Sequence, residues 1–181
     1  VQYERLAAQA RTVLHEEAPR VLGVVEPIKV VIKGLPTTAA IAGKTHLDVP
    51  HFPHDPSRGS HPVPVPTLND KTGNVEIYID QSDFRMVDSP DFYGLAPGKM
   101  VGLRYLSRII CDTAECDENG KPTVLNCSWV DDDNTNKPKV YIQWVGASDS
   151  IKFELRIYNN LFTVEEPTDD WEAQLNPYSE E

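Results

Sequence analysis

The sequence predicts a mainly β protein, an antiparallel barrel-like sheet preceded by one N-terminal helix. Fifteen prolines in 181 residues exceed the usual share of roughly one in twenty, which favours short strands and irregular connections over a helical bundle. About six or seven segments are apolar and β-branched or alternate apolar with polar residues, and closed or nearly closed antiparallel sheets are the common solution for that pattern. No period of about 20 to 50 residues repeats, which excludes a solenoid.

The first half of the chain is predicted to contain the helix, two strands and a long loop. Residues 2–16 place apolar side chains near one helical face, and the next proline ends that helix. Residues 21–33 are apolar and β-branched and predict a strand, in which Pro27 indicates an edge or a bulge. Residues 34–66 are rich in Pro, His, Ser and Gly and predict a loop with little regular structure. Residues 74–81 alternate as a half-buried strand does.

The second half is predicted to contain only strands and loops. The predicted strands are 99–111, 123–130, 140–145 and 151–158. In the last of these, apolar and charged residues alternate one by one, which is typical of a strand with one buried face. The C-terminal segment shows no clear period.

The net charge of −11 is unevenly distributed. Residues 165–181 contain seven acids and no base, and residues 112–133 contain seven acids and one lysine. These two segments contribute −7 and −6, so the rest of the chain sums to +2. A net charge describes the whole field and not one face. The acidity therefore argues against indiscriminate nucleic-acid binding and leaves room for a local basic face.

The cysteines and the apolar runs indicate a cytoplasmic protein. No run of about 18 apolar residues occurs, and the N-terminus lacks the apolar region of a signal peptide. The three cysteines cannot form a complete disulfide framework and are not spaced as zinc ligands, so we expect buried or half-buried reduced thiols.

Metal and catalytic sites find little support in the sequence. Four histidines gather in the proline-rich loop, at His46, His51, His54 and His61, where polar loop residues are favoured over metal ligands. The acidic triplet 131–133 lacks the glycine and distal glutamate of an EF-hand, which favours a solvated loop. No GxSxG, GxxxxGK[ST] or GxGxxG motif is present.

The segment between residues 85 and 108 supports a nucleic-acid-binding site more strongly than any segment supports a catalytic or metal site. There, basic side chains alternate with aromatic ones: Arg85, Phe92, Tyr93, Lys99, Arg104, Tyr105 and Arg108. Unstacked bases are recognised by aromatic and guanidinium planes, and lysine supplies a point charge for phosphate. The same pattern also suits an ordinary strand with one face in and one face out, and the pattern alone favours that second interpretation.

Five stretches in order resemble the C-terminal anticodon-binding region of glutaminyl-tRNA synthetases. They are EEAPRVLGVVEPIKVVI (16–32), VPHFPHDPSRGSHPVPV (49–65), IYIDQSDFR (77–85), LAPGKMVGLRY (95–105) and the segment 137–167. The resemblance implies β-barrels that bind the anticodon loop of tRNA(Gln). It implies three parts: 1–20 as the end of a helical subdomain, 21–164 as the anticodon-binding barrel region, and 165–181 as an acidic tail leading to a missing C-terminal part.

The resemblance also implies roles for individual residues. Arg20 corresponds to an arginine near the middle anticodon base, and Arg104 to one near the first base. This chain has Gly102 where bacterial-type members carry another arginine, and its glycine resembles animal-type members, which indicates a eukaryotic enzyme. For the third base the family uses polar and basic side chains at the positions held here by Asp91, Tyr93 and Gly94, so that pocket does not transfer. Together the pattern and the resemblance select seven candidate tRNA-binding residues: Arg20, Arg85, Phe92, Tyr93, Lys99, Arg104 and Tyr105.

No ATP-binding signature of the family's catalytic half occurs in this chain. We therefore expect a recognition module with no cofactor of its own, while ATP and Mg²⁺ serve the parent aminoacyl-tRNA ligase. Partners in a multi-synthetase assembly are a further expectation. Two alternatives stay open: the related glutamyl-tRNA synthetase, and an acidic β-barrel that binds a protein.

Overall fold

The computed structural model describes residues 3–36, 41–130 and 137–180. The chain forms two compact units, Val1–Ser150 and Ile151–Glu181. Within the described residues, the helix and the strands lie in the first unit, and the second unit contains turns, isolated bridges and one short 3-10 helix.

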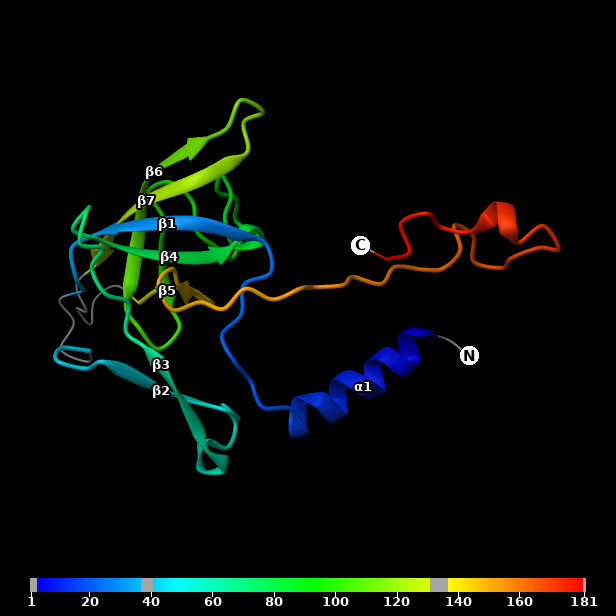
Figure 1. Cartoon of the computed structure of the whole chain (residues 1–181), viewed down its shortest axis with the longest axis horizontal. Coiled ribbons are helices and arrows are strands. Elements are labelled where there is room, and N and C mark those ends of the chain that lie inside the picture. Colours follow the sequence, from blue (N-terminus) through cyan, green and yellow to red (C-terminus); the bar gives the residue numbers. More distant parts are fainter. Residues whose placement is uncertain (1–2, 37–40, 131–136, 181) are drawn as a thin grey trace. The chain divides into compact units, whose positions relative to one another are not determined.

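The first unit is built on a curled seven-stranded sheet with the order β8-β5-β6-β7-β1-β4-β9, which forms a half-barrel (Figure 1). This confirms the mainly β class. Its strands are β1 Pro27–Lys33, β4 Asn74–Asp80, β5 Met100–Leu103, β6 Arg108–Cys116, β7 Pro122–Val130, β8 Tyr141–Ile142 and β9 Val145–Gly146.

The sheet is mixed and not purely antiparallel. β1 pairs with β7, and β5 pairs with β8, in parallel. Each parallel pair joins segments that are far apart in the chain, because parallel neighbours need a crossover connection. Apolar alternation within one strand carries no information about the direction of its neighbour, so the sequence could not predict these pairs.

The core lies inside the curl of the sheet and follows the predicted alternation. Val75, Ile77 and Ile79 of β4 are fully buried, and the residues between them are half-buried. β1 begins at Pro27, later than predicted, and lies between β4 and β7 rather than at an edge. The proline is tolerated because it is the first residue of the strand.

The N-terminal helix α1, Tyr3–Glu17, matches the predicted helix and ends before Pro19. Two of its contacts to the rest of the unit lie at its C-terminal end. The guanidinium of Arg58 donates a hydrogen bond of 2.8 Å to the carbonyl oxygen of Glu16, which caps the last turn. The ring of His15 lies 4.7 Å from that of His54.

The prediction of an irregular loop over residues 34–66 is wrong. A two-stranded antiparallel hairpin forms there, from β2 His46–Pro50 and β3 Ser60–Pro64, and it projects beside the main sheet (Figure 1). The prolines in this segment argued against strands. They are tolerated because the outer edges of an isolated hairpin form no hydrogen bonds to a further strand. Inside it the rings of His51 and His61 stack at 4.9 Å.

The predicted single strand 99–111 is also wrong, because the chain reverses in its middle. β5 and β6 are joined by a four-residue turn over 104–107, in which Leu103 N–H donates to the carbonyl oxygen of Ser107 at 2.7 Å. Tyr105 has a φ of +65°, a conformation that is uncommon for residues other than glycine. No glycine, proline or asparagine marks this turn, so the sequence offered no signal for it.

The second unit contradicts the predicted strand 151–158. Its residues form no ladder in the described part of the chain, and the pairings present are the isolated bridges Tyr158–Glu180 and Phe162–Leu175. A short 3-10 turn, Glu172–Gln174, precedes the second bridge partner. Apolar alternation leads to a strand only where a partner edge is present.

The remaining sequence predictions concern cysteines, the acidic triplet and membrane spans. Cys111 and Cys127 are buried and face each other across β6 and β7, and all three cysteines are free thiols, although Cys116 is exposed. The triplet 131–133 lies outside the described residues. Among the described helices, none has the length and apolar character needed to cross a bilayer.

Candidate nucleic-acid interface

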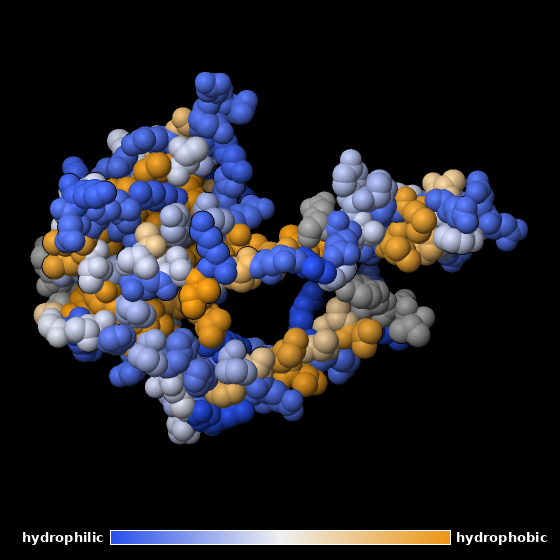
Figure 2. All heavy atoms as spheres, in the orientation of Figure 1, coloured by the Kyte–Doolittle hydropathy of each residue, from blue (hydrophilic) through white to orange (hydrophobic). Residues whose placement is uncertain are grey.

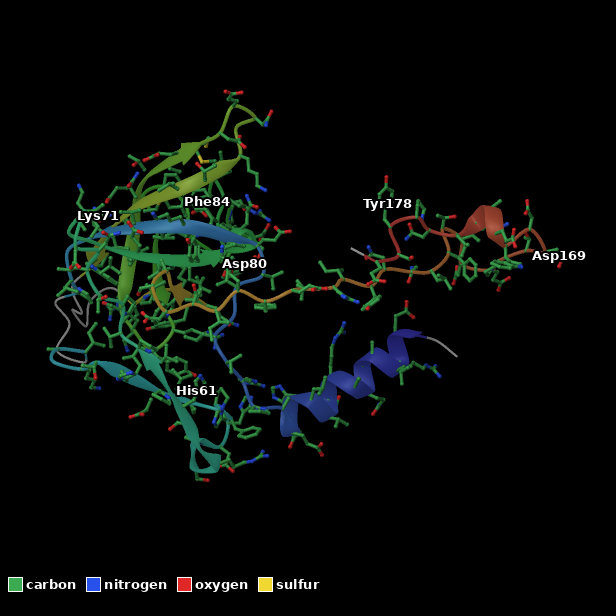
Figure 3. All side chains as sticks on the ribbon, in the orientation of Figure 1. His61, Lys71, Asp80, Phe84, Asp169 and Tyr178 are labelled. Carbon is green, nitrogen blue, oxygen red and sulfur yellow. The ribbon has the colours of Figure 1, made fainter. Side chains whose placement is uncertain are left out.

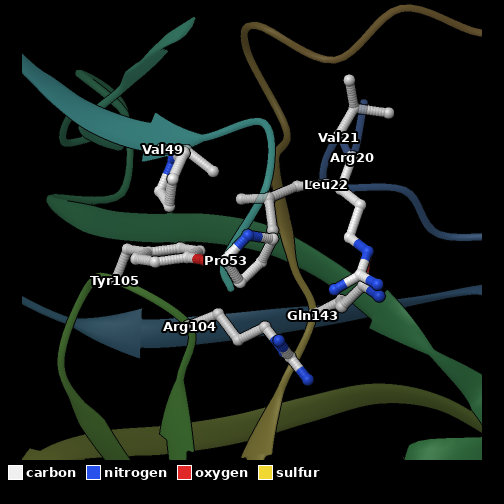
Figure 4. Close-up of a pocket in the computed structure, with 9 residues that line it drawn as sticks. Arg20, Val21, Leu22, Val49, Pro53, Arg104, Tyr105 and Gln143 are labelled. Carbon is white, nitrogen blue, oxygen red and sulfur yellow. The ribbon is translucent and has the colours of Figure 1, made fainter. Parts of the chain in front are cut away.

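The turn between β5 and β6 forms one side of a small pocket on the first unit (Figure 4). Arg104 and Tyr105 line it from the turn, Arg20 lines it from the segment after α1, and Gln143 lines it from the segment after β8. Val49 and Pro53, among other residues, contribute apolar surface. Its cavity volume is about 40 Å³, so it holds water but not a whole base. A base would therefore lie across its mouth.

The backbone of Arg104 is fixed on both sides. Its N–H donates to the carbonyl oxygen of Ile142 at 3.0 Å, and its carbonyl oxygen accepts a 2.9 Å hydrogen bond from Nε1 of Trp144. The Trp144 side chain is fully buried, so this anchor is rigid. The Arg104 side chain is exposed, and Tyr105 is 39% exposed beside it. The turn thus presents a guanidinium and an aromatic ring from a preorganised backbone, as base recognition requires.

Arg20 reaches the same pocket from a sequence-distant segment. Its N–H donates to the carbonyl oxygen of His51 at 2.9 Å, and its guanidinium donates to Nδ1 of His15 at 2.7 Å. Gly23 N–H donates to the Gln143 side chain at 3.2 Å, which ties this segment to the edge of the sheet. Arg20 and Arg104 thus line one pocket.

The carboxyl groups of Asp80 and Asp83 have pKa values that are shifted in opposite directions. Burial alone would raise the pKa of Asp80, but hydrogen bonds from Ser82 and from the N–H groups of Glu26 and Val25 hold it below its usual value. Figure 3 shows Asp80 at the end of β4, where it pairs with the start of β1. Burial and the charge of Asp80 raise the pKa of Asp83, and the positive charge of Arg104 opposes that rise.

Arg85, Phe92 and Lys99 form a separate cluster outside the Arg104 pocket, in which the two cations contact the Phe92 ring. Phe92 is only 8% exposed, and its ring lies 4.5 Å from the guanidinium carbon of Arg85 and 5.2 Å from Nζ of Lys99. Nζ of Lys99 also contacts Asp88 at 2.6 Å and the carbonyl oxygen of Phe92 at 2.7 Å. The Lys99 hydrogen bond lowers the pKa of Asp88. The Phe92 ring is therefore covered, and Lys99 is engaged within the chain.

The acidic hairpin tip is far from the Arg104 pocket. The turn 117–121 lies at one end of β6 and the Arg104 turn at the other, and a nine-residue strand spans about 30 Å. Figure 2 shows that this tip is hydrophilic. Because surface charges are screened beyond about 8 Å at physiological salt, these acids do not cancel the field of the two arginines.

Gly94 and Gly102 leave no room for a side chain in the present packing. A Cβ at Gly94 would lie 2.6 Å from the carbonyl oxygen of Asp83 and 2.3 Å from Cζ of Phe92. A Cβ at Gly102 would lie 2.3 Å from the ring of Tyr141, which packs on the glycine. Neither position accepts an arginine without displacing its neighbours.

Replacing Gly102 with alanine is expected to lower the free energy of unfolding by about 1 kcal/mol, because the Tyr141 ring must leave its place. The ring is half exposed and can rotate away, which limits the cost. Denaturant unfolding of Gly102→Ala, Tyr141→Ala and the double variant measures the coupling. In the double variant the cost of the alanine should vanish; strict additivity would contradict the contact.

Sequence reasoning selected some residues of the pocket and missed others. It correctly selected Arg20, Arg104 and Tyr105, which line this pocket. It also selected four residues that do not line it: Arg85, Phe92, Tyr93 and Lys99. It missed Gln143, an exposed residue between two short strands. The one sequence feature that could have drawn attention to Gln143 is the adjacent Trp144, which lies in a segment that resembles the family.

Comparison with protein families assigns the chain. A family model described as "tRNA synthetases class I (E and Q), anti-codon binding domain" matches residues 18–130, and a second model with the same description matches residues 141–181. The chain belongs to this family of anticodon-binding domains.

Individual relatives narrow the assignment. The chain is 36% identical over 182 residues to a probable glutamine–tRNA ligase of Dictyostelium discoideum, 35% over 189 residues to a glutamine–tRNA ligase of Lupinus luteus, and 36% over 187 residues to one of Pseudoalteromonas atlantica. Each alignment covers 99% of this chain. It covers 22% of the first two relatives and 31% of the third, so the chain spans less than a third of their length. These names favour the glutaminyl over the glutamyl alternative.

Proposed function

We propose that this chain recognises the anticodon loop of tRNA(Gln), as the anticodon-binding part of a glutamine–tRNA ligase. One observation carries the proposal: Arg20 and Arg104, from segments 84 residues apart, converge on one pocket with the exposed ring of Tyr105. Guanidinium groups offer a planar fork of donors for base edges, and an aromatic ring offers a stacking surface.

Each residue has a distinct part in this proposal. Arg104, held by Trp144 and Ile142, contacts the first anticodon base, and Arg20, held by His51 and His15, contacts the middle base. Tyr105 stacks on a base at the pocket mouth. In this proposal the chain serves recognition, and the ligase reaction with ATP and Mg²⁺ is assigned to a catalytic half outside residues 1–181.

Replacing Arg104 with alanine is expected to weaken binding of the cognate anticodon loop by about 1 to 3 kcal/mol and to abolish discrimination at the first base. Fluorescence anisotropy with two labelled anticodon stem-loops that differ only at that base measures both effects. The matched control is Arg11→Ala, which removes an equal charge from the exposed surface of α1.

The outcomes separate the alternatives. An equal loss with both stem-loops would indicate a phosphate contact only. No loss would remove Arg104 from the interface. Binding that ignores the anticodon altogether would favour the acidic protein-binding module.

The cellular setting belongs to the same proposal. One relative, 36% identical over 190 residues, is named a cytoplasmic glutamine–tRNA ligase of Arabidopsis thaliana, which supports a cytoplasmic location. Exposed apolar side chains on α1, Leu6 and Val13 among them, leave surface for a multi-synthetase partner.

A further inference from the structure

Two thiols face each other in the core of the sheet, on the neighbouring strands β6 and β7 (Figure 1). Cys111 and Cys127 are directly opposite in the strand register, and the two residues are 0% and 1% exposed. The proposed function uses neither thiol. A facing pair of thiols is a site for two-electron oxidation where the backbone allows a disulfide.

The backbone places this pair within disulfide distance. Cys111 turns its N–H and its carbonyl oxygen away from Cys127. The N–H donates to the carbonyl oxygen of Lys99 at 3.4 Å, and the carbonyl oxygen accepts a 2.8 Å hydrogen bond from Gly98 N–H. The two cysteines are therefore a non-hydrogen-bonded pair, for which antiparallel strands bring the Cα atoms to about 4.5 Å. Disulfides span Cα separations of about 4.4 to 6.8 Å, so a bond requires little movement of either strand.

A β-bulge beside the pair gives β6 room to adjust. The register between β6 and β7 shifts between Cys111 and Thr113, and Asp112 has no partner in the ladder. A ladder is locally disrupted at a bulge, and regions with fewer ladder hydrogen bonds open more readily. We therefore expect a small oxidant such as hydrogen peroxide to reach the sulfur atoms through local opening, while bulky reagents stay excluded.

The two thiols are chemically unequal. A hydrogen bond from the Cys127 thiol lowers the pKa of Cys111, although burial opposes that shift. The same hydrogen bond, together with burial, raises the pKa of Cys127. Because the thiolate is the nucleophile, Cys111 is the sulfur suited to attack an oxidant, and Cys127 is the sulfur suited to resolve the product.

We propose that Cys111 and Cys127 are a redox-active pair, which a peroxide converts reversibly into a cross-strand disulfide that locks β6 to β7. The Cys111 thiolate attacks hydrogen peroxide: an S–O bond forms, the O–O bond breaks and hydroxide leaves. The Cys127 sulfur then forms the S–S bond, and the oxygen of the sulfenic acid leaves as water. In total the two thiols lose two electrons and two protons, and the peroxide becomes two molecules of water. A dithiol reductant reverses the oxidation by thiol–disulfide exchange.

The first test counts thiols after oxidation of the folded chain. Cys116→Ser removes the exposed thiol, which lies about 17 Å from Cys111 along β6 and could otherwise link two chains. After hydrogen peroxide and then unfolding in an alkylating reagent, the intact mass should show no alkylated cysteine. Peptide mapping should join positions 111 and 127, and dithiothreitol should restore both thiols. Two alkylated thiols, or sulfinic acids without a disulfide, would overturn the proposal.

The second test assigns the two roles in the Cys116→Ser background. Cys127→Ser keeps a hydroxyl donor beside Cys111, so peroxide should produce a sulfenic acid that dimedone captures. Cys111→Ser should leave Cys127 unreactive under the same conditions. Equal capture at both positions would contradict the assigned roles. The first test substitutes neither core cysteine, so it decides the disulfide even where these variants fold poorly.

The third test measures the lock. The disulfide closes a loop between residues 16 apart in the chain, which restricts the unfolded state. In urea denaturation the oxidised chain should have a folded-to-unfolded ratio about tenfold higher than the reduced chain, or more. An oxidised chain that is no more stable than the reduced one would show that the bond does not lock the strands. None of these measurements uses RNA, so this inference and the proposed function succeed or fail separately.

Discussion

Replacing Trp144 with alanine is expected to lower the free energy of unfolding by about 3 to 5 kcal/mol, the cost typical of removing a large aromatic core residue. Trp144 is fully buried and follows the short strand β8. The substitution leaves a cavity beneath the Arg104 turn and removes the indole that holds the turn's carbonyl oxygen. Urea denaturation monitored by far-UV circular dichroism measures the loss.

The milder substitution Trp144→Phe separates stability from function. It keeps an aromatic core residue and removes the 2.9 Å hydrogen bond to Arg104, so stability should fall by about 1 to 2 kcal/mol. Because the turn then loses its anchor, discrimination at the first anticodon base should weaken several-fold in the anisotropy assay.

A second tryptophan provides the matched control. Nε1 of Trp129 donates a hydrogen bond of 3.0 Å to the carbonyl oxygen of Gly34, away from the pocket. Trp129→Phe should therefore cost a similar amount of stability and leave RNA binding unchanged. If both variants bind RNA equally well, Trp144 supports the fold but does not position Arg104.

Replacing Gly94 with alanine is expected to destabilise the protein by about 2 to 3 kcal/mol, near the upper end for an overpacked core. The new Cβ would meet the backbone carbonyl oxygen of Asp83, which cannot rotate away, as well as the ring of Phe92. Thermal unfolding should show a lower midpoint. The Phe92 ring must shift in this variant, which also disturbs its contacts with Arg85 and Lys99.

Gly23 is the control for that substitution. A Cβ there would meet nothing within 4 Å, and its φ lies outside the left-handed region. Gly23→Ala should leave the protein unchanged or stabilise it by about 0.4 to 1 kcal/mol, since alanine restricts the unfolded chain. A Gly94→Ala variant as stable as the control would show that the segment 91–95 repacks freely.

The candidate site was partly predictable from the sequence. Arg20 and Arg104 came from motifs in register with a known family, and such motifs preserve the chain order of functional residues. The roles of Phe92 and Lys99 could not be predicted, because the sequence does not show whether an aromatic or basic side chain in such a pattern is buried or exposed.

The sequence by itself determined those structural features that depend on residues close together in the chain. The alternation of Val75, Ile77 and Ile79 specified a half-buried strand, because side chains on a strand change face at every residue. The apolar period of residues 2–16 specified α1 in the same way. Composition specified a mainly β chain, since frequent prolines and short apolar runs leave few other solutions.

Only the tertiary structure decided the direction of the strand pairs, the turn at Tyr105, and the exposure and contacts of each candidate side chain. The parallel pair β1–β7 and the anchoring of Arg104 by Trp144 join residues far apart in the chain. Such contacts are selected by the free energy of the whole fold, so no local pattern reports them. The strained φ of Tyr105 has the same origin, because the surrounding hydrogen bonds offset a cost that the residue alone would avoid.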